Sequence, residues 1–307
     1  MVPRSLSAKR TSQLPENNPT IAITGGAGRI GRLVAADLRA WGARLRILDL
    51  PQANFEGLSG EAGIDVFPGD ITDREYVAGA LAGCDVVVHL AAVLPPVADE
   101  NEALALKVNV GGTASVLAAI ASSCPDARLV FSSSVVVYGN TQAGAPPVSC
   151  DRELAGVGSY ARSKVESEAL IAESLIPVTI LRVSGVAVAE ALMPPQPWPF
   201  TADQRMEFVL LEDAAGPLAK AAKDPSTVGR TYNVAGGESW RMRGSAYSAD
   251  YYGLLMMAPE DAGFLEESRA FDYYDTTDTV TDLGFEPTPY GQYLERTGAA
   301  IREMFGI

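Results

Sequence analysis

Several residue types are scarce in this chain of 307 residues, and each shortage excludes a class of protein. A single histidine, His89, excludes any mechanism that needs two imidazoles. The three cysteines, Cys84, Cys124 and Cys150, form no CxxC pair and no cluster with histidine, which argues against a zinc site and a disulfide framework. We therefore expect three reduced thiols in a cytoplasmic protein, with no bound metal.

Positive charge is also in deficit, because 24 Lys and Arg face 38 Asp and Glu, giving a formal net charge of −14. The imbalance is strongest from Ser245 onward, where 12 acidic residues face three arginines and no lysine. Such a surface repels nucleic acid and anionic membranes. No run of 18 apolar residues is present either. We expect no transmembrane helix, no membrane partner and no nucleic-acid partner.

What the chain does contain, from Thr20 onward, is an alternation of short apolar strands with helical stretches. The strands are expected at residues 20–24, 44–49, 64–70, 85–92, 128–133 and 178–183. The helices between them are expected at residues 29–41, 73–81, 101–123 and 159–174. Repeated strand-then-helix units predict an α/β fold, a doubly wound parallel sheet (Rossmann) with right-handed crossovers.

The composition divides the chain into three regions. Residues 1–19 are polar and are expected to form a flexible N-terminal extension, and residues 20–183 are expected to form the Rossmann domain. Residues 184–307 form mainly a smaller C-terminal substrate lobe, although 228–236 are expected to return to the Rossmann sheet. Four prolines in residues 193–200 indicate either a fixed wall of the substrate pocket or a linker between the lobes.

A glycine-rich turn follows the first predicted strand. In TIAITGGAGRIG, Gly26, Gly28 and Gly31 have the GxGxxG spacing of a dinucleotide-binding turn, and the next helix would offer its N-terminus to phosphates. Asp49 ends the second strand 21 residues after Gly28, where a carboxylate accepts the ribose 2′-OH and repels a 2′-phosphate. The pattern predicts NAD rather than NADP. Asp70 ends the third strand and is a candidate to bind the adenine amino group, to cap the next helix, or to do both.

Two further motifs carry polar groups for catalysis. Tyr160 and Lys164 lie four residues apart on a predicted helix and therefore share a face. An ammonium beside a tyrosine favours the phenolate and lowers its pKa, as a general acid/base requires. Ser134 lies where a buried strand ends, at the sheet edge where ligands bind in such folds. Taken alone, each motif is compatible with chance.

Together, these motifs resemble the extended short-chain dehydrogenase/reductase superfamily, specifically the NAD-dependent epimerase/dehydratase family. The resemblance rests on TGGAGRIG, GDITD, HLAA, VNVGGT, SSSVVVYG, SYARSK, ILRVSG and YNVAGGES. It implies that Ser134 donates a hydrogen bond to substrate, that Tyr160 is the acid/base, and that Lys164 holds the nicotinamide ribose.

The resemblance also implies a wider set of site residues, with His89 only a packed strand residue. The cofactor, NAD, would contact Tyr160, Lys164, Gly25, Gly28, Arg29, Ile30, Gly31, Asp49, Asp70, Ile71, Leu90, Ala91, Ala92, Asn109 and Ser132. The substrate would contact Val93, Ser134, Val135, Ser184 and Arg205.

The chain departs from nucleotide-sugar members of the family after the last Rossmann strand. ILRVSGVAV lacks their asparagine, and only 22 residues separate Arg182 from Arg205. We expect a compact pocket, too small for a nucleoside diphosphate. Arg205, Arg241 and Arg243 either meet an anionic group of the substrate or pair with the acidic lobe.

These features predict an NAD-dependent oxidoreductase that transfers hydride reversibly at a hydroxyl or carbonyl carbon of a small molecule, such as a sugar or sugar acid. The first alternative is a nucleotide-sugar epimerase or dehydratase that retains tightly bound NAD. The second is a non-catalytic NAD-binding sensor. We expect the chain to act as a homodimer.

Overall fold

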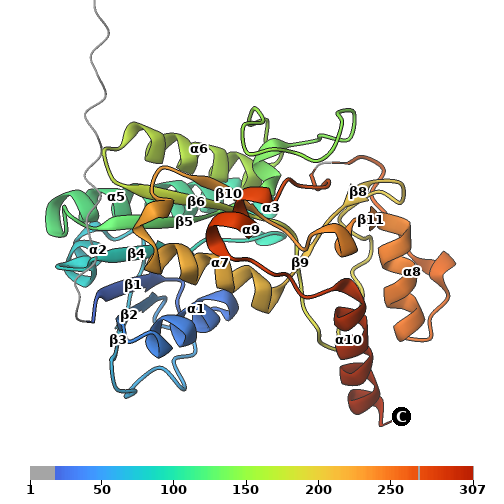
Figure 1. The fold of residues 1–307 in the computed structure, drawn as a ribbon, viewed down its shortest axis with the longest axis horizontal. Helices are drawn as coiled ribbons and strands as arrows, with labels where there is room; N and C mark the ends of the chain where they lie inside the picture. Colours follow the sequence, from blue (N-terminus) through green and yellow to red (C-terminus); the bar gives the residue numbers. More distant parts are fainter. Residues whose placement is uncertain (1–17, 269, 307) are drawn as a thin grey trace, which may run out of the picture.

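The computed structural model describes residues 18–268 and 270–306, and its centre is a seven-stranded parallel sheet (Figure 1). Almost all of the expected N-terminal extension, residues 1–17, lies outside the described residues. The strand order is β10-β6-β5-β4-β1-β2-β3. These strands are β1 (Thr20–Thr24), β2 (Arg44–Asp49), β3 (Ile64–Pro68), β4 (Val86–His89), β5 (Arg128–Ser134), β6 (Val178–Val183) and β10 (Thr231–Val234). The predicted doubly wound fold is confirmed.

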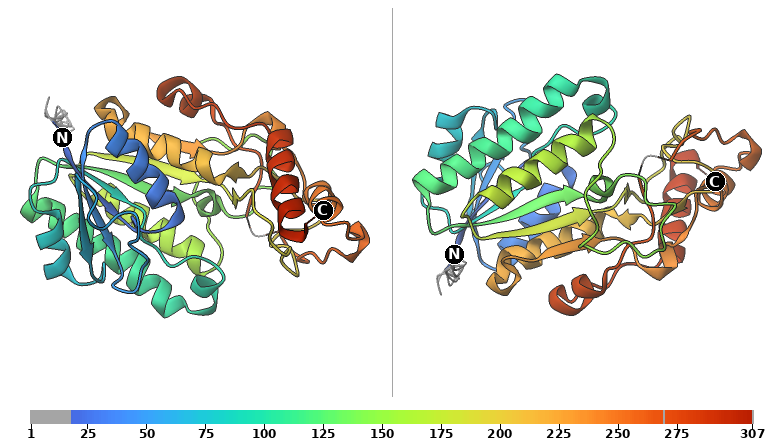
Figure 2. Two further views of the ribbon diagram at one scale, coloured as in Figure 1. Left: turned by 90° about the horizontal axis from the view of Figure 1, so that it is seen from below. Right: turned by 90° about the horizontal axis from the view of Figure 1, so that it is seen from above.

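Helices cover both faces of this sheet (Figure 2). On one face, α1 (Arg29–Ala40) packs against α7 (Leu211–Lys223), with α9 (Thr277–Leu283) beside α7. On the other face lie α2 (Arg74–Leu81), α5 (Gly111–Ser123) and α6 (Ser159–Glu173). Both α7 and the edge strand β10 come from the C-terminal part of the chain, so the sheet domain is not contiguous in sequence.

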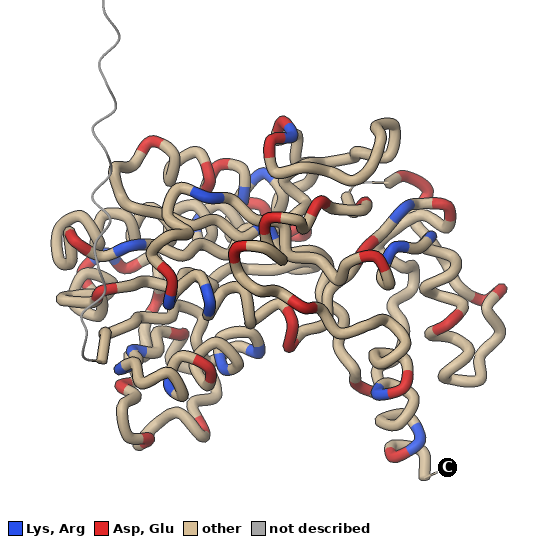
Figure 3. The backbone as a smooth tube through the Cα atoms, in the orientation of Figure 1, with Lys and Arg blue, Asp and Glu red and all other residues tan. Residues whose placement is uncertain are grey.

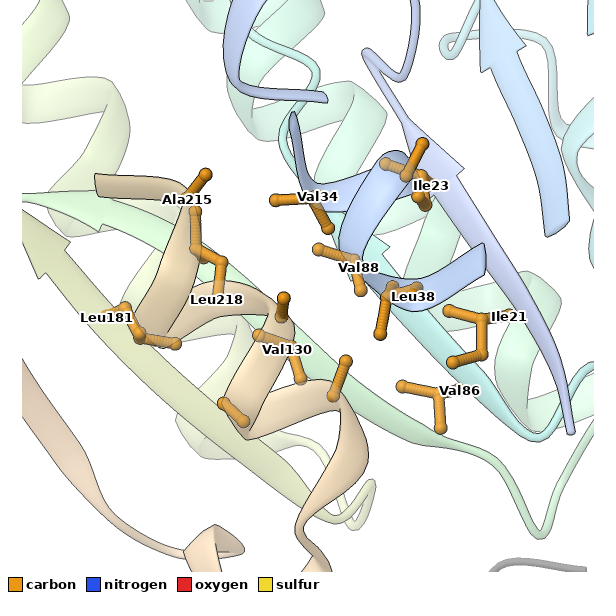
Figure 4. Packing of buried hydrophobic residues seen from close by; sticks show 14 of the residues in the cluster. Ile21, Ile23, Val34, Leu38, Val86, Val88, Val130, Leu181, Ala215 and Leu218 are labelled. Carbon is orange, nitrogen blue, oxygen red and sulfur yellow. The ribbon is translucent and has the colours of Figure 1, made fainter. Parts of the chain in front are cut away.

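Strand periodicity divides the apolar side chains between the two faces. In β1, Ile21 and Ile23 enter the core beneath α1 and α7, whereas Ala22 enters the core beneath α2 and α5. The first core is almost entirely aliphatic and includes Val86, Val88 and other β-branched residues of the neighbouring strands (Figure 4). Because both faces are covered, these strands are apolar throughout, as parallel strands require.

The helix expected at residues 101–123 is interrupted in the structure. It consists of α4 (Glu102–Ala105), a π-helical turn η1 (Leu106–Val110) and α5. By length and composition alone, the run Glu102–Ser123 could cross a membrane, but half of it is buried within the fold, where α5 packs against α2 and α6. That burial is typical of a core helix, and the absence of a membrane partner stays a prediction.

The smaller lobe contains two helices and two-residue strand pairs, and it lies beyond the C-terminal ends of the sheet strands (Figure 1). Its elements are β7 (Val186–Ala187), β8 (Arg205–Met206), β9 (Val209–Leu210), β11 (Met242–Arg243), α8 (Gly244–Leu254) and α10 (Tyr290–Phe305). Single-turn segments complete the chain: α3 (Val97–Glu100), η2 (Val135–Tyr138), η3 (Pro225–Thr227), η4 (Glu238–Trp240) and η5 (Pro259–Asp261).

The proline-rich segment supplies core residues to the smaller lobe. Trp198 is 5% exposed and its ring stacks on Phe200, with centroids 5.4 Å apart. Tyr247 and Tyr251 meet the Trp198 ring edge-on. Neither Trp198 nor Phe200 lines the main cavity. The expectation that this segment forms a pocket wall is therefore wrong for Trp198, because its aromatic ring is buried with the other rings of the lobe.

Candidate active site

A cavity of about 720 Å³ opens at the C-terminal ends of the sheet strands, and its volume lies in the usual range for small-molecule sites. All but three of the predicted site residues line it. They are Gly25, Gly28, Arg29, Ile30, Gly31, Asp49, Asp70, Ile71, Leu90, Ala91, Ala92, Val93, Ser132, Ser134, Tyr160, Lys164 and Ser184.

The glycine turn at one end of the cavity has no room for side chains. Gly25 has φ +68°, and a Cβ there would lie 2.9 Å from the Ala91 nitrogen. A Cβ at Gly31 would lie 2.4 Å from the Gly25 carbonyl oxygen. Helix α1 begins after Gly28 with no side-chain cap, so its first N–H groups are available to an anion. These features fit the pyrophosphate of a dinucleotide.

Three charged side chains surround this end of the cavity. Asp49 ends β2, where its Oδ2 accepts from the Ala27 N–H at 3.0 Å and its Oδ1 accepts from the Leu50 N–H at 2.8 Å. Arg29, at the start of α1, forms an ion pair with Glu190 of the smaller lobe. Asp70 completes the set. The carboxylate of Asp49 is thus held beside the glycine turn, where a ribose hydroxyl of the dinucleotide is expected.

The structure excludes one of the two roles considered for Asp70, that of capping the next helix. Helix α2 is capped by Asp73, whose carboxylate accepts from the Glu75 and Tyr76 N–H groups. Asp70 instead accepts from the Thr72 N–H and hydroxyl, each at 2.9 Å. The capping role proposed for Asp70 is wrong, because Asp73 occupies the N-cap position.

At the other end of the cavity, α6 and β5 bring the three expected catalytic side chains together. The Lys164 ammonium donates to the Ser132 carbonyl oxygen at 2.8 Å and lies 6.0 Å from the centre of the Tyr160 ring. Burial lowers the pKa of Lys164 to about 8, an effect that nearby Glu168 opposes. Burial also raises the pKa of Tyr160, and a hydrogen bond with Ser134 opposes that rise.

The direction of the Tyr160 pKa differs from the sequence expectation. The expectation was that the Lys164 ammonium lowers this pKa, but burial dominates and raises it. The phenol is therefore protonated at neutral pH in this structure. A protonated Tyr160 can donate to a substrate oxygen, as the acid partner in carbonyl reduction must.

A buried ion pair lies directly beneath these catalytic groups, and the sequence analysis missed it. Glu168 follows Lys164 by one helical turn, and its carboxylate accepts from Arg182 of β6 at 2.7 and 3.0 Å. The Ser133 hydroxyl donates to the same carboxylate at 2.6 Å, and Arg182 donates to the Tyr138 hydroxyl at 2.9 Å. The ion pair thus ties β6 to α6, and the Ser133 hydrogen bond adds the end of β5. The i, i+4 spacing from Lys164 was the available signal.

Three predicted site residues do not line the cavity. Asn109, 2% exposed, uses its amide to hold the backbone N–H and carbonyl of Val93 at 2.7 and 3.1 Å, and so acts behind the cavity wall. Val135 is buried in a separate cluster with Tyr138. Arg205 is the third case.

Arg205 was expected to contact substrate, but its guanidinium is already paired. It donates to the buried Asp272 carboxylate at 2.7 and 2.9 Å and to the Gly144 carbonyl at 2.9 Å. Arg241 likewise pairs with buried Glu207, at 3.0 Å. Of the two roles considered, the structure shows pairing with acidic groups for Arg205 and Arg241, whereas Arg243 donates to the Asp203 carbonyl. Figure 3 shows acidic residues spread widely along the chain, with basic residues among them.

His89 occupies the position expected of a packed strand residue. It is 1% exposed, and its two ring nitrogens meet the hydroxyls of Thr24 and Thr113 at 2.6 and 3.1 Å. Burial lowers its pKa to about 3. His89 is neutral at physiological pH and does not reach the cavity.

The sequence analysis did not identify several aliphatic residues of the cavity wall. Val186 and Val188 follow β6, and Leu211 begins α7 next to β9. Their shared position in the cavity wall depends on the short pairing of β7 with β9, which places Val186 opposite Val209. Two-residue strands have no detectable periodicity, so no sequence signal indicated this part of the wall.

Comparison with curated proteins finds relatives of partial length. The Rattus norvegicus 3 beta-hydroxysteroid dehydrogenase type 7 is 33% identical over 129 residues, covering 40% of this chain and 38% of that protein. The Mycobacterium tuberculosis 3 beta-hydroxysteroid dehydrogenase/Delta 5→4-isomerase is 34% identical over 131 residues, covering 40% and 34%. The chain thus matches well under half the length of these relatives.

Comparison with solved structures finds the same fold over nearly the whole chain. A dTDP-glucose 4,6-dehydratase from Streptomyces venezuelae, solved with NAD bound, is 21% identical with a TM-score of 0.79, covering 93% of this chain and 98% of that one. A short-chain dehydrogenase/reductase superfamily protein from Agrobacterium tumefaciens, also with bound NAD, is 22% identical with a TM-score of 0.76, covering 94% and 98%.

The family model agrees with the motifs and the cavity. The model described as the NAD dependent epimerase/dehydratase family matches residues 21–187, which hold the glycine turn, Asp49, Ser134, Tyr160 and Lys164. The resemblance inferred from the sequence is confirmed. Because this match covers more than half of the chain, the protein belongs to the NAD dependent epimerase/dehydratase family.

Proposed function

We propose that the protein is an NAD-dependent oxidoreductase that transfers hydride reversibly at a hydroxyl or carbonyl carbon of a small molecule. The observation that carries this proposal is the convergence of Ser134, Tyr160 and Lys164 on the cavity that also contains the glycine turn. The relatives named as hydroxysteroid dehydrogenases and dehydratases support redox chemistry of this type.

The cofactor end has a residue for each part of a dinucleotide. The N–H groups at the start of α1 would hold the pyrophosphate, and Asp49 would accept from the adenosine ribose. Asp70 would meet the adenine amino group. Lys164, fixed by the Ser132 carbonyl, would donate to the nicotinamide ribose. Since the Asp49 carboxylate would repel a 2′-phosphate, we expect NAD to bind more tightly than NADP.

At the catalytic end, each polar group has one task. Bound NAD supplies the acceptor for hydride in one direction, and NADH the donor in the other. In reduction the Tyr160 phenol donates its proton to the carbonyl oxygen, and in oxidation the phenolate, formed once that proton has left, accepts the proton of the substrate hydroxyl. Ser134 donates a hydrogen bond to the same oxygen, and the Lys164 ammonium stabilises the phenolate while the proton is absent.

The proposal is tested with Tyr160→Phe, which removes the acid/base but keeps the ring. We expect turnover to fall at least about 100-fold, because general acid–base catalysis contributes that much or more. NAD affinity, measured by calorimetry, should change less than about twofold. Tyr273→Phe, outside the cavity, is the control and should retain full activity. Undiminished turnover in Tyr160→Phe would contradict the mechanism.

Two other functions give different results in the same assays. A redox-neutral epimerase or dehydratase would convert nucleotide sugars with no net change in NADH absorbance. A sensor would bind NAD with no turnover. Tighter binding of NADP than NAD would contradict the role of Asp49, and Asp49→Ala should relax the preference for NAD. The expected cytoplasmic homodimer stays a prediction, which sedimentation of the purified protein and its localisation in cells would test.

A further inference from the structure

The two ends of the cavity differ in charge. Four charged side chains line it: Arg29, Asp49, Asp70 and Lys164. The first three surround the glycine turn and the ends of β2 and β3, where the adenosine and pyrophosphate would lie. Lys164 is committed to the Ser132 carbonyl and the nicotinamide ribose. No charged lining side chain therefore remains for the substrate among the residues that the structure describes.

The wall around the reacting position is aliphatic. Val93 and Leu94 follow β4, while Val186 and Val188 follow β6 on the segment that pairs with β9. Leu94 is 58% exposed and Val186 is 38% exposed, so both lie where the cavity opens. Such exposure of cavity-lining aliphatic groups favours a ligand that covers them, since burial of their apolar surface contributes about 25 cal/mol per Å².

The polar side chains near this wall already have partners. Ser184 donates its hydroxyl to the Glu207 carbonyl, and Ser133 donates to Glu168. Arg205 is held by Asp272. Among the described residues that line the cavity, the hydroxyls without such a partner are those of Ser132, Ser134 and Tyr160, and the last two would bind the reacting oxygen. A sugar would bring several further hydroxyls to an aliphatic surface, and each one left without a partner costs about 1–3 kcal/mol.

We infer that the substrate is an apolar secondary alcohol or its ketone, an alicyclic or aryl compound whose principal polar group is the reacting oxygen. This inference rests on the proposed function and replaces the sugar or sugar acid expected from the sequence. In oxidation, the carbinol C–H bond breaks and its electron pair passes with the hydrogen to NAD. The hydroxyl proton passes to the phenolate form of Tyr160, which becomes the phenol, and the C=O bond forms.

Matched ring compounds test the inference on the purified protein with NAD. Cyclohexanol and myo-inositol share a six-membered ring and differ in their hydroxyl groups, and trans-2-decalol extends the apolar surface. We expect kcat/KM for trans-2-decalol and cyclohexanol to exceed that for myo-inositol at least about tenfold, because unpaired buried hydroxyls are costly. Faster oxidation of myo-inositol or glucose, or conversion of UDP-glucose, would overturn the inference.

A double variant places polar groups on the same wall at low risk to folding, because both positions are partly exposed. Leu94→Asn combined with Val186→Thr should lower kcat/KM for trans-2-decalol about tenfold. NAD affinity should stay within about twofold. The control Met193→Asn changes a residue that is 73% exposed and outside the cavity, and it should behave as wild type. An unchanged kcat/KM in the double variant would contradict the apolar wall.

Calorimetry separates failure of this inference from failure of the proposed function. trans-2-Decalone is titrated into Tyr160→Phe saturated with NADH, alongside myo-inosose, the ketone of inositol. Binding of the decalone but not of the inosose supports the inference. If the wild type then turns over neither compound, the oxidoreductase proposal is wrong while the inference about the apolar ligand stands. Tighter binding of the polyhydroxy ketone, or no detectable binding of the decalone, overturns the inference and leaves hydride transfer to be judged by turnover.

Discussion

The sheet domain and the smaller lobe bury different kinds of side chain. Beneath α1 and α7 the core consists almost entirely of Ile, Val, Leu and Ala, supplied by strands at regular spacing (Figure 4). The lobe buries Trp198, Phe200, Trp240, Tyr247 and Tyr293 in one cluster. Backbone pairing positions the first core. In the lobe, where each paired strand has only two residues, the packing of aromatic rings against one another positions the core residues instead.

Both regions bury ion pairs, but these pairs differ in their relation to the cavity. The lobe pairs, Asp272 with Arg205 and Glu207 with Arg241, do not line the cavity. In the sheet domain, Glu168 and Arg182 are 6% and 7% exposed, and Glu168 accepts from Ser133, which does line it. Substitutions in the two regions should therefore affect stability and cofactor binding differently.

The largest effect is expected at this ion pair. Glu168→Ala leaves Arg182 buried without its carboxylate and also removes the partner of Ser133, so we expect a loss of about 4 kcal/mol in the free energy of unfolding. Because Ser133 lies between Ser132 and Ser134, NAD affinity and turnover should fall in the same variant. Urea unfolding and calorimetry measure both quantities.

Glu166→Ala is the matched control, since Glu166 lies on the same helix but is exposed. It should change stability by less than about 0.5 kcal/mol. Equal stability losses in the two variants would show that the buried pair has no special role.

A somewhat smaller effect, confined to stability, is expected in the lobe. Trp198→Ala removes the ring that packs between Phe200 and Tyr251 and should cost about 3 kcal/mol. NAD affinity should stay within about twofold, because Trp198 does not line the cavity. Trp41→Ala, at a position 43% exposed, is the control and should cost far less. A large loss of NAD affinity in Trp198→Ala would show that the lobe core supports the cofactor site.

The sheet domain was predictable because its signals are local. Strands β1, β2 and β6 match the expected residues, and the Tyr160–Lys164 spacing placed both side chains on the cavity, since helix periodicity fixes which residues share a face. The lobe gave no such signal. The sequence shows that Arg205 is basic and Trp198 aromatic, but whether they face substrate depends on Asp272 and Tyr251, partners more than 50 residues away.

The contacts within the cavity wall also could not be predicted from local sequence signals. Asn109 was expected to contact NAD, but it lies on the π-helical turn η1, where a regular helix was expected, and holds Val93 from behind the cavity wall. The burial that raises the pKa of Tyr160 also depends on the assembled fold. Residue spacing predicted the three residues proposed for catalysis, whereas their electrostatic environment could be described only from the three-dimensional packing.

The smallest change in stability is expected at Lys164. This residue is proposed to hold the nicotinamide ribose, yet its buried charge destabilises the folded protein. Burial lowers the pKa of this lysine from 10.5 to about 8 in the folded protein. The charged form is therefore disfavoured by folding. This penalty is fully present below pH 8, and it fades as the pH rises toward 10.5, where the unfolded lysine also loses its proton. Replacement by an uncharged side chain of similar length should remove it.

Lys164→Met should accordingly raise the free energy of unfolding of the NAD-free protein by about 1–2 kcal/mol at pH 7, after the loss of the Ser132 hydrogen bond is included. The gain should decrease as the pH rises from 8 to 10.5 and become a loss at the upper end, where only the missing Ser132 hydrogen bond remains, a trend that urea unfolding across this range would follow. Lys107→Met changes an exposed lysine and should show no such trend. Saturation with NAD should reverse the order, because only the wild type holds the ribose; a variant that is less stable without NAD as well would contradict the penalty assigned to the buried ammonium.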